Sequence, residues 1–142
     1  MSDLITKHRV VVNKMDLKLN SNNVEILEEN DYLLVKCAKD ASIEQKEKTL
    51  DKIVNYVQDK SITNVLFDLR ETLSSMNEDE HLSCGELILN RKNDLSKSKI
   101  AFLIKEKEPV LFLSVAYAGG FTNFIEVDCE NDASLWFSDQ MK

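Results

Sequence analysis

Asp68 and Arg70 are the polar residues whose types and position best suit a binding site. They follow the apolar run Val65–Phe67, and open α/β sheets place ligands beside polar groups at the carboxyl ends of their strands. The guanidinium group of Arg70 offers a planar fork of donors to a carboxylate or a phosphate. Alternatively, Arg70 pairs with Asp68 or Glu71 and only fixes the loop. We favour this second interpretation, because a functional site usually brings several polar groups together in a pocket.

The other chemically reactive residues form no catalytic or metal-binding pattern. His8 and His81 are the only histidines and lie far apart in the sequence, while Cys37, Cys84 and Cys129 are widely spaced without a Cys-x-x-Cys pair. Such spacing argues against a disulfide framework and a zinc site, so we expect reduced packing cysteines. The sequence predicts a non-enzymatic protein with no catalytic residue, no metal and no cofactor.

The composition indicates a single folded domain. The chain has 142 residues, 43% hydrophobic and 30% charged, which is a globular balance. Its formal net charge of −7 should repel nucleic acid and anionic bilayers. No stretch approaches the ~20 apolar residues of a membrane span, and residues 1–20 lack a signal-peptide core. These features predict a cytoplasmic protein that neither spans a membrane nor binds nucleic acid.

Residues 22–142 are predicted to form the domain, with residues 1–21 as an N-terminal arm or an extra edge strand. Short apolar runs alternate with amphipathic stretches and predict the element order ββαβαβαβα. Since strands joined through helices run parallel after right-handed crossovers, we expect an open α/β sheet with an antiparallel edge from the first strand. In chain order the predicted elements are strands Val24–Leu27 and Tyr32–Ala38, a helix from Ile43 to Val57, strand Asn64–Asp68, a helix after Ser75 that ends near Asn90, strand Lys99–Ile104, helix Pro109–Ala118, strand Phe124–Asp128 and helix Asp132–Gln140.

Two helix starts are predicted from capping-box spacing, in which a Ser or Thr is followed three residues later by Glu or Gln. Ser42 with Gln45 and Ser75 with Glu78 both fit this pattern. Consecutive apolar residues further predict strands that are covered on both faces. The side chains expected to be buried are Val65, Leu66, Phe67, Ile100, Phe102 and Leu103 in the sheet, with Leu135 and Trp136 docking the last helix.

The segment Pro109–Ala118 is unusually apolar, since Ser114 is its only polar side chain before Gly119 and Gly120. A helix that is apolar all round turns only one side to a sheet, so the other side needs cover. We rank a dimer or partner-protein interface first, a buried strand in place of the helix second, and a site for an apolar ligand third. The candidate interface residues are Leu111, Phe112, Val115 and Tyr117.

Three stretches carry a family resemblance: VLFDLRE at 65–71, SKIAFLI at 98–104 and FIEVDCENDASLWF at 124–137. A strand ending in Asp-Leu-Arg, a second strand, and a last strand leading into an Ala-x-x-Trp helix resemble the SpoIIAA-like branch of the STAS superfamily. The resemblance covers residues 22–140. It implies a STAS-like α/β fold and a non-enzymatic regulatory or protein-binding role, with a small-molecule or lipid carrier as the alternative.

The resemblance also implies a phosphorylation site. Anti-sigma antagonists of this family carry a phosphorylatable serine in an Asp-Ser-(Ser/Thr)-Gly turn after the corresponding strand. The matching stretch here is Thr72–Asn77, which holds Ser74 and Ser75 but lacks the aspartate and the glycine. Ser74 and Ser75 are therefore the phosphorylation candidates, while a helix-capping function of Ser75 is the interpretation that we favour.

Overall fold

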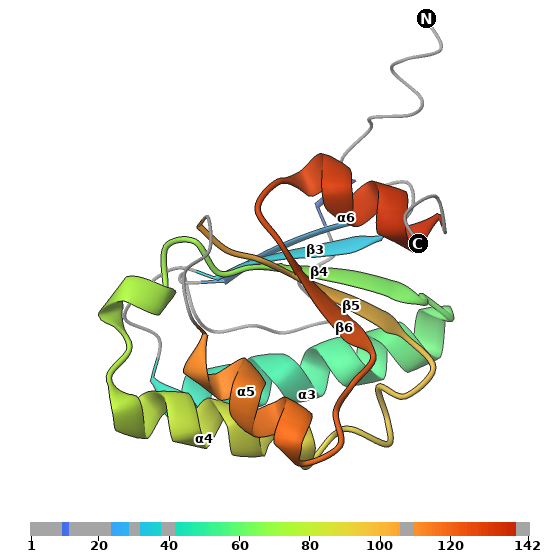
Figure 1. Cartoon of the computed structure of the whole chain (residues 1–142). Coiled ribbons are helices and arrows are strands. Elements are labelled where there is room, and N and C mark those ends of the chain that lie inside the picture. Colours follow the sequence, from blue (N-terminus) through green and yellow to red (C-terminus); the bar gives the residue numbers. More distant parts are fainter. Residues whose placement is uncertain (1–9, 12–23, 29–31, 38–41, 106–109, 139–142) are drawn as a thin grey trace, which may run out of the picture.

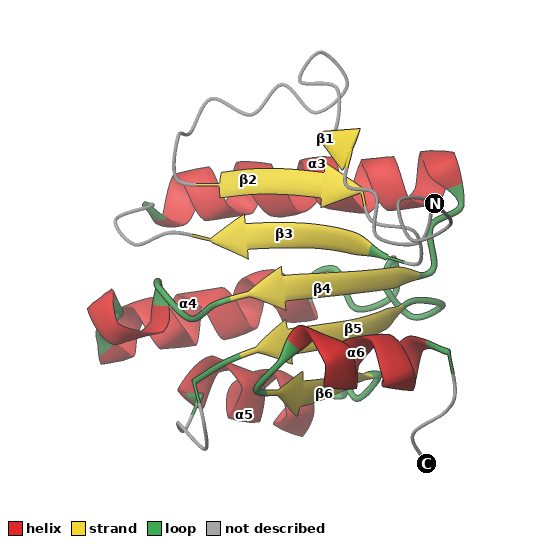
Figure 2. Cartoon of the chain, turned by 90° about the horizontal axis from the view of Figure 1, so that it is seen from above, coloured by secondary structure: helices red, strands yellow, loops and turns green. Residues whose placement is uncertain are grey.

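A mixed β-sheet forms the central layer of the protein (Figure 1). The computed structural model describes residues 10–11, 24–28, 32–37, 42–105 and 110–138. The strands in this part of the chain are β1 (Val10–Val11), β2 (Val24–Glu28), β3 (Leu33–Cys37), β4 (Asn64–Asp68), β5 (Lys99–Leu103) and β6 (Phe124–Val127). They lie in the spatial order β1-β2-β3-β4-β5-β6 (Figure 2).

Helices cover both faces of the sheet. Those that the structure describes are α3 (Ile43–Lys60), α4 (Glu78–Leu89), α5 (Leu111–Ala118) and α6 (Glu130–Phe137), together with the short 3₁₀ helix η1 (Leu73–Ser75). Helices α3, α4 and α5 lie against one face, and α6 lies against the other (Figure 1). The protein therefore has three layers.

The predicted hairpin and parallel sheet are confirmed. Strand β2 pairs antiparallel with β3, and β3 to β6 then run parallel to one another in chain order, which places β4 in the interior of the sheet. Val10 and Val11 form the short edge strand β1, in which Val10 lies opposite Glu28 of β2. The remainder of the predicted N-terminal segment 1–21 lies outside the described residues.

Side chains that alternate along the strands enter two separate cores. In β4, Val65 belongs to the core beneath α3, α4 and α5, whereas Leu66 belongs to the core beneath α6. A strand with one apolar side chain for each core explains the consecutive apolar residues of its sequence. Phe67 is only half-buried, and its ring stacks on that of Phe102 at 5.4 Å. The predicted core residues that are fully confirmed as buried are Val65, Leu66, Ile100, Phe102 and Leu103.

The predicted start of α3 is confirmed. Ser42 Oγ accepts a hydrogen bond from the Gln45 backbone at 3.1 Å, and Gln45 Oε1 accepts one from the Ser42 backbone at 2.8 Å. These reciprocal bonds satisfy donors that the first helical turn leaves unpaired. The helix ends at Ser61, whose left-handed backbone has a φ of 58°.

The predicted capping function of Ser75 is wrong, because α4 begins two residues later. Asn77 Oδ1 accepts from the Glu80 backbone at 2.9 Å, and Glu80 Oε1 accepts from the Asn77 backbone at 3.0 Å, so this pair forms the capping box. Ser75 belongs to η1 instead, where its hydroxyl donates to the Thr72 carbonyl at 2.9 Å. Asparagine caps helices as well as serine does, and spacing alone does not distinguish the two starts.

The docking of α6 confirms the prediction in part, because Trp136 packs against the core beneath this helix, as Ile125 of β6 does. Leu135 is 39% exposed and Trp136 is half-buried, whereas Ala133 and Phe137 are buried. The helix begins at Glu130, and the four-residue spacing of Ala133 and Phe137 sets both on the face that meets the sheet. The ring centroids of Phe137 and Tyr32 lie 5.2 Å apart across this contact.

The apolar segment after β5 is a helix, so the alternative of a buried strand is wrong. Helix α5 spans Leu111–Ala118 and ends at Gly119. Pro109, which was expected to open it, lies outside the described residues. Helix α4 packs directly against α5, and together with the sheet it covers more of α5 than the sequence analysis expected.

Candidate functional site

Asp68 and Arg70 pair with each other at the carboxyl end of β4. Asp68 Oδ1 accepts from Arg70 Nε at 3.0 Å and from the Arg70 backbone at 3.1 Å, while Oδ2 accepts from the second guanidinium nitrogen at 2.8 Å. Burial by itself would raise the pKa of Asp68, but the hydrogen bonds and charge of Arg70 outweigh it and hold that pKa below its usual value. The guanidinium fork is therefore occupied within the chain, as in the interpretation that we favoured.

The surroundings of Arg70 are acidic. After the hydrogen bond with Asp68, which outweighs the opposing effect of burial, the nearby charges of Glu130 and Glu71 contribute to raising the pKa of Arg70. Glu130 itself accepts a hydrogen bond from the Tyr32 hydroxyl at 3.1 Å. Tyr32 and Glu130 were missed by the sequence analysis because they lie 98 residues apart in the chain. The charges of Glu130 and Glu71 therefore make the surroundings of Arg70 less favourable for an incoming anion.

The two serine candidates lie together in η1. Ser75 is exposed and its hydroxyl bonds to the turn, while the side chain of Ser74 lies outside the described part of the structure. Phosphorylation of either serine stays a prediction.

The four candidate interface residues on α5 separate into two pairs. Leu111 and Tyr117 are 38% and 61% exposed. Phe112 is 4% exposed, and its ring lies 6.0 Å from that of Phe102 within the core. Val115 faces α4, where a Cβ atom placed on Gly85 would lie 2.7 Å from Val115 Cγ1. Leu111 and Tyr117 are thus the exposed candidates, while Val115 is half-buried and Phe112 is buried.

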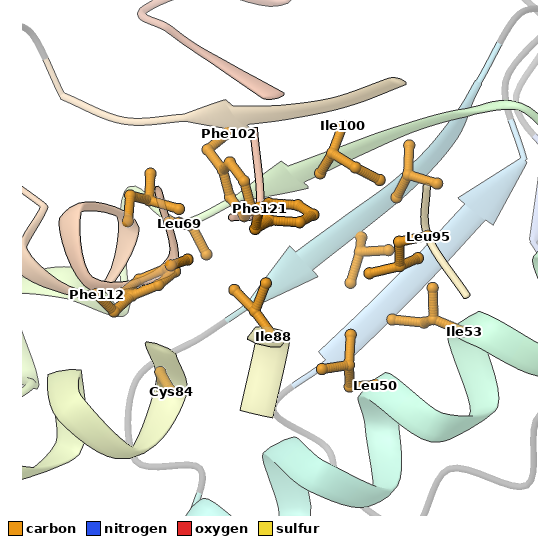
Figure 3. Packing of buried hydrophobic residues seen from close by; sticks show 14 of the residues in the cluster. Leu50, Ile53, Leu69, Cys84, Ile88, Leu95, Ile100, Phe102, Phe112 and Phe121 are labelled. Carbon is orange, nitrogen blue, oxygen red and sulfur yellow. The ribbon is translucent and has the colours of Figure 1, made fainter. Parts of the chain in front are cut away.

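An apolar cavity of about 100 Å³ lies between the sheet and helices α3, α4 and α5. In Figure 3 the side chains around it come from all three helices and from the strands above them. Apolar cavities of about 150 Å³ stay dry and take up a benzene ring, so this smaller space suits a ligand body no larger than that ring. Its walls include Leu50 and Ile53 from α3, Ile88 from α4, Ile100 and Phe102 from β5, and Phe112 from α5.

No sequence pattern predicted this cavity, although small residues on the inward faces of helices are a weak signal for it. Thr49 of α3 and Cys84 of α4 are both buried in its lining, where larger side chains would fill the space. Thr72, which is 3% exposed, also lines the cavity, and its Oγ1 has no hydrogen-bond partner among the described residues. A cavity is a shortage of volume between elements, so no local pattern predicts it.

The half-buried residues of the cavity lining are Cys37, Lys46, Phe67, Met76 and Leu87. Three of them lie where β3 ends and α3 and α4 begin, and we infer that the cavity opens there. Cys37 at the end of β3, Lys46 in the first turns of α3 and Met76 just before α4 all belong to the lining and are half-buried. We call this group of residues the mouth of the cavity. Lys46 is the charged residue there.

Two thiols of the cavity lining, Cys37 at the mouth and Cys84 deeper inside, are influenced by the charge of Lys46. Burial of the sulfur raises the pKa of Cys37 to about 12, although the residue as a whole is half-buried, and the charge of Asp68 adds to this effect. Burial also raises the pKa of Cys84. Lys46 opposes both shifts, and after burial it is the next cause that lowers the pKa of His81. The two thiols therefore stay protonated and unreactive near neutral pH.

A group of possible metal ligands lies at the start of α6. Oxygen and sulfur atoms of Asp128, Cys129 and Asp132 lie within 4.8 Å of one another. Acidic residues are favoured in the first turn of a helix by its dipole alone. The dipole accounts for Asp132, and because exposed acidic groups are common without a metal, the group by itself is not evidence for one.

Comparison with known proteins does not test the resemblance to the STAS superfamily, which stays a prediction. No protein-family model matches the chain, and the search of curated proteins finds no match. Among the described residues, no helix has both the length and the apolar character needed to cross a bilayer.

Proposed function

We propose that this chain is a non-enzymatic binding domain that takes up a small apolar molecule in the cavity between the sheet and helices α3, α4 and α5. The observation that carries the proposal is the cavity of about 100 Å³ with its apolar walls. Ligand sites are typically concave and mostly apolar, and burial of apolar ligand surface contributes roughly 25 cal/mol for each Å². The protonated thiols of Cys37 and Cys84 keep the walls uncharged.

The broader assignment that we propose is a STAS-like regulatory module of the cytoplasm. The parallel order of β3 to β6 and the position of Asp68 and Arg70 at the end of β4 support the resemblance. The free thiols of Cys37, Cys84 and Cys129 suit a reducing compartment. In such a module the ligand would act as a signal rather than as a substrate.

Titration of methyl-labelled protein with hexanol, followed by NMR, tests uptake into the cavity. Saturable shifts are expected at the methyl groups of Leu50, Ile53 and Ile88, which line it. Cys84→Phe adds a ring to the wall and should abolish the shifts, while Cys129→Phe adds the same ring at an exposed position and should preserve them. Should Cys84→Phe fail to fold through overpacking, Met76→Trp blocks the mouth instead. Hexanol shifts confined to exposed residues would contradict the proposal.

A second candidate function is self-association through α5, and the exposure of two large side chains favours it. Tyr117 is 61% exposed and its ring lies 6.3 Å from that of Phe124 in β6, while Leu111 is 38% exposed. Strand β6 is at the edge of the sheet formed by the described strands. Exposed apolar side chains beside an open strand edge are typical of contact surfaces.

Analytical ultracentrifugation of wild type, Leu111→Glu and Tyr117→Glu tests this second candidate. Both substitutions place a charge on an exposed position, so folding should be retained while the associated mass falls. Asn131→Glu, on an exposed position of α6, is the control that should leave the mass unchanged. A wild type that sediments as a monomer at high micromolar concentration would remove this candidate.

A further inference from the structure

We infer that the ligand of the cavity is a small monocarboxylic acid, with its apolar body in the cavity and its carboxylate paired with Lys46 at the mouth. This inference rests on the proposed function, since it names the ligand class for the same site. The volume of about 100 Å³ is smaller than the cavity of about 150 Å³ that takes up benzene, so the enclosed body has at most about six carbon atoms.

Lys46 is positioned to bind a charged head group of a ligand in the cavity. It lies in the first turns of α3, belongs to the cavity lining and is half-buried. A lysine in such a place lays its aliphatic stem along the apolar wall and keeps its ammonium in water. The stem then extends the apolar wall up to the mouth, and the charge stands at the point where a ligand's head group would emerge.

The Lys46 ammonium has no ion-pair partner within the part of the chain that the structure describes. No carboxylate among these residues lies within ion-pair distance of it. Asp68 and Glu80 are the acidic groups that act on the same thiols as Lys46. Both are already bonded: Asp68 pairs with Arg70, and Glu80 accepts a hydrogen bond from the Asn77 backbone in the α4 capping box. The cation that shifts the pKa values of Cys37, Cys84 and His81 is therefore available to a ligand.

The contrast with Arg91 supports this assignment. Arg91 also faces α3, but its guanidinium group bonds to Asp51 at 2.7 Å and to Glu47 at 3.3 Å. The basic group on that side of α3 is thus neutralised by the helix itself, while Lys46 is left unpaired among the described residues. A carboxylate at the mouth would complete an ammonium–carboxylate pair beside a water-poor wall, where such pairs are stronger than at an open surface.

Three probes with the same six-carbon chain distinguish the contribution of the head group to the affinity from that of the apolar body. Hexanoate, hexanol and hexylammonium are titrated calorimetrically into the full chain at neutral pH. Hexanoate should bind about tenfold more tightly than hexanol, as expected for a hydrogen bond to a charged group, and hexylammonium should bind most weakly. Added sodium chloride should weaken hexanoate binding and leave hexanol binding unchanged, since salt screens the charge pair only.

Lys46→Met tests the assignment at the residue itself, because methionine keeps an apolar stem and removes the charge. The variant should bind hexanoate about tenfold more weakly, at the level of hexanol, and its hexanol affinity should be unchanged. Lys46→Arg should restore part of the hexanoate preference. The matched control is Lys48→Met, which removes the same charge from an exposed position of the same helix outside the lining.

The outcomes separate this inference from the function on which it rests. Equal binding of hexanoate and hexanol by wild type, or an equal loss of both in Lys46→Met, overturns the carboxylate assignment while uptake into the cavity stands. The same loss of hexanoate affinity in Lys48→Met also overturns it, since a general charge effect would then explain the preference. Saturable binding of none of the three probes would contradict the proposed function and this inference together.

Discussion

At the scale of single residues, the hydrogen bonding of buried and half-buried polar groups shows which of them are available for binding. Arg70, a candidate binding residue, is instead hydrogen-bonded to the neighbouring Asp68, with distances of 2.8 to 3.1 Å. Thr72 is the opposite case, since its hydroxyl oxygen is buried without a partner among the described residues. A buried group without a hydrogen bond lowers stability, and a functional site is a common reason for keeping one.

Thr72→Val is expected to stabilise the protein. Valine has nearly the same shape, so the substitution replaces an unpaired buried hydroxyl with a methyl group and should raise the free energy of unfolding by about 1 kcal/mol. Urea denaturation followed by circular dichroism measures the change. Thr63→Val, at an exposed position, is the control and should change little. A clear loss of stability in Thr72→Val would mean that the hydroxyl has a partner in the folded protein.

His81 should make stability depend on pH. Its Nδ1 accepts a hydrogen bond from the Phe112 backbone at the start of α5 at 3.3 Å, which requires the neutral imidazole. Burial, and next the charge of Lys46, lower the pKa of His81 against the opposing charge of Glu80. Since the unfolded chain then binds the proton more tightly, this contribution is complete above the unfolded pKa of about 6.5 and is lost as pH falls through the folded pKa.

The measurement is the free energy of unfolding between pH 8 and pH 5 in wild type, His81→Gln and His8→Gln. The wild type should lose stability over this range, and His81→Gln should lose less because the titrating group is gone. His8→Gln removes the only other histidine of the chain and should follow the wild type. Parallel pH profiles for wild type and His81→Gln would show that His81 contributes nothing to this dependence.

At the scale of elements, the contact between α4 and α5 depends on a glycine. A Cβ atom on Gly85 would lie 2.7 and 2.9 Å from Cγ1 and Cβ of Val115 and 3.2 Å from the Phe112 carbonyl oxygen. Such distances require the helices to separate, because neither the Val115 Cβ atom nor the backbone yields easily. This close approach explains how α4 covers one side of an apolar helix.

Gly85→Ala should therefore destabilise the protein by about 1 to 2 kcal/mol, since overpacking outweighs the gain in helix propensity. Gly119→Ala is a matched variant, because a Cβ atom there would meet only the side chain of Leu89, with both Cδ atoms at 2.6 Å and Cγ at 3.2 Å, and no backbone atom. Thermal denaturation should show the larger loss for Gly85→Ala. A Gly85→Ala variant as stable as wild type would mean that α4 and α5 adjust freely.

The contact of α6 with the sheet gives a second prediction at this scale. Phe137→Ala should cost about 3 to 5 kcal/mol, as for other buried aromatic residues, because Phe137 is only 6% exposed and packs against Tyr32. Leu135→Ala changes a residue that is 39% exposed and should cost much less. Chemical denaturation of the two variants compares them directly. The reverse order would mean that α6 docks through Leu135, as the sequence suggested.

At the scale of the whole molecule, the net charge of −7 sets the long-range behaviour. A negative field repels the phosphates of nucleic acid, and binding that depends on phosphate contacts is strongest at low salt. The full chain should therefore give no shift of a fluorescent 20-base-pair duplex in anisotropy measurements, even at low ionic strength. Saturable binding that weakens with added salt would show a local basic surface that overrides the net charge.

The sequence alone determined the order of the strands and helices, the hairpin, the parallel sheet and the start of α3. These follow from local patterns: alternating or continuous apolar runs, helical spacing, and a polar pair three residues apart at Ser42 and Gln45. The sequence also placed Asp68 and Arg70 at the end of β4, because a strand's last residues can be located from its apolar run.

The tertiary structure alone decided how these elements use their side chains. Whether α4 starts after Ser75 or at Asn77 depended on the turn that engages Ser75 first. Which face of α5 stays exposed depended on the approach of α4 at Gly85. The cavity depended on the combined volumes of side chains from three helices and the sheet. Packing depends on the volumes of side chains that lie far apart in the chain, so it cannot be predicted from any single stretch of sequence.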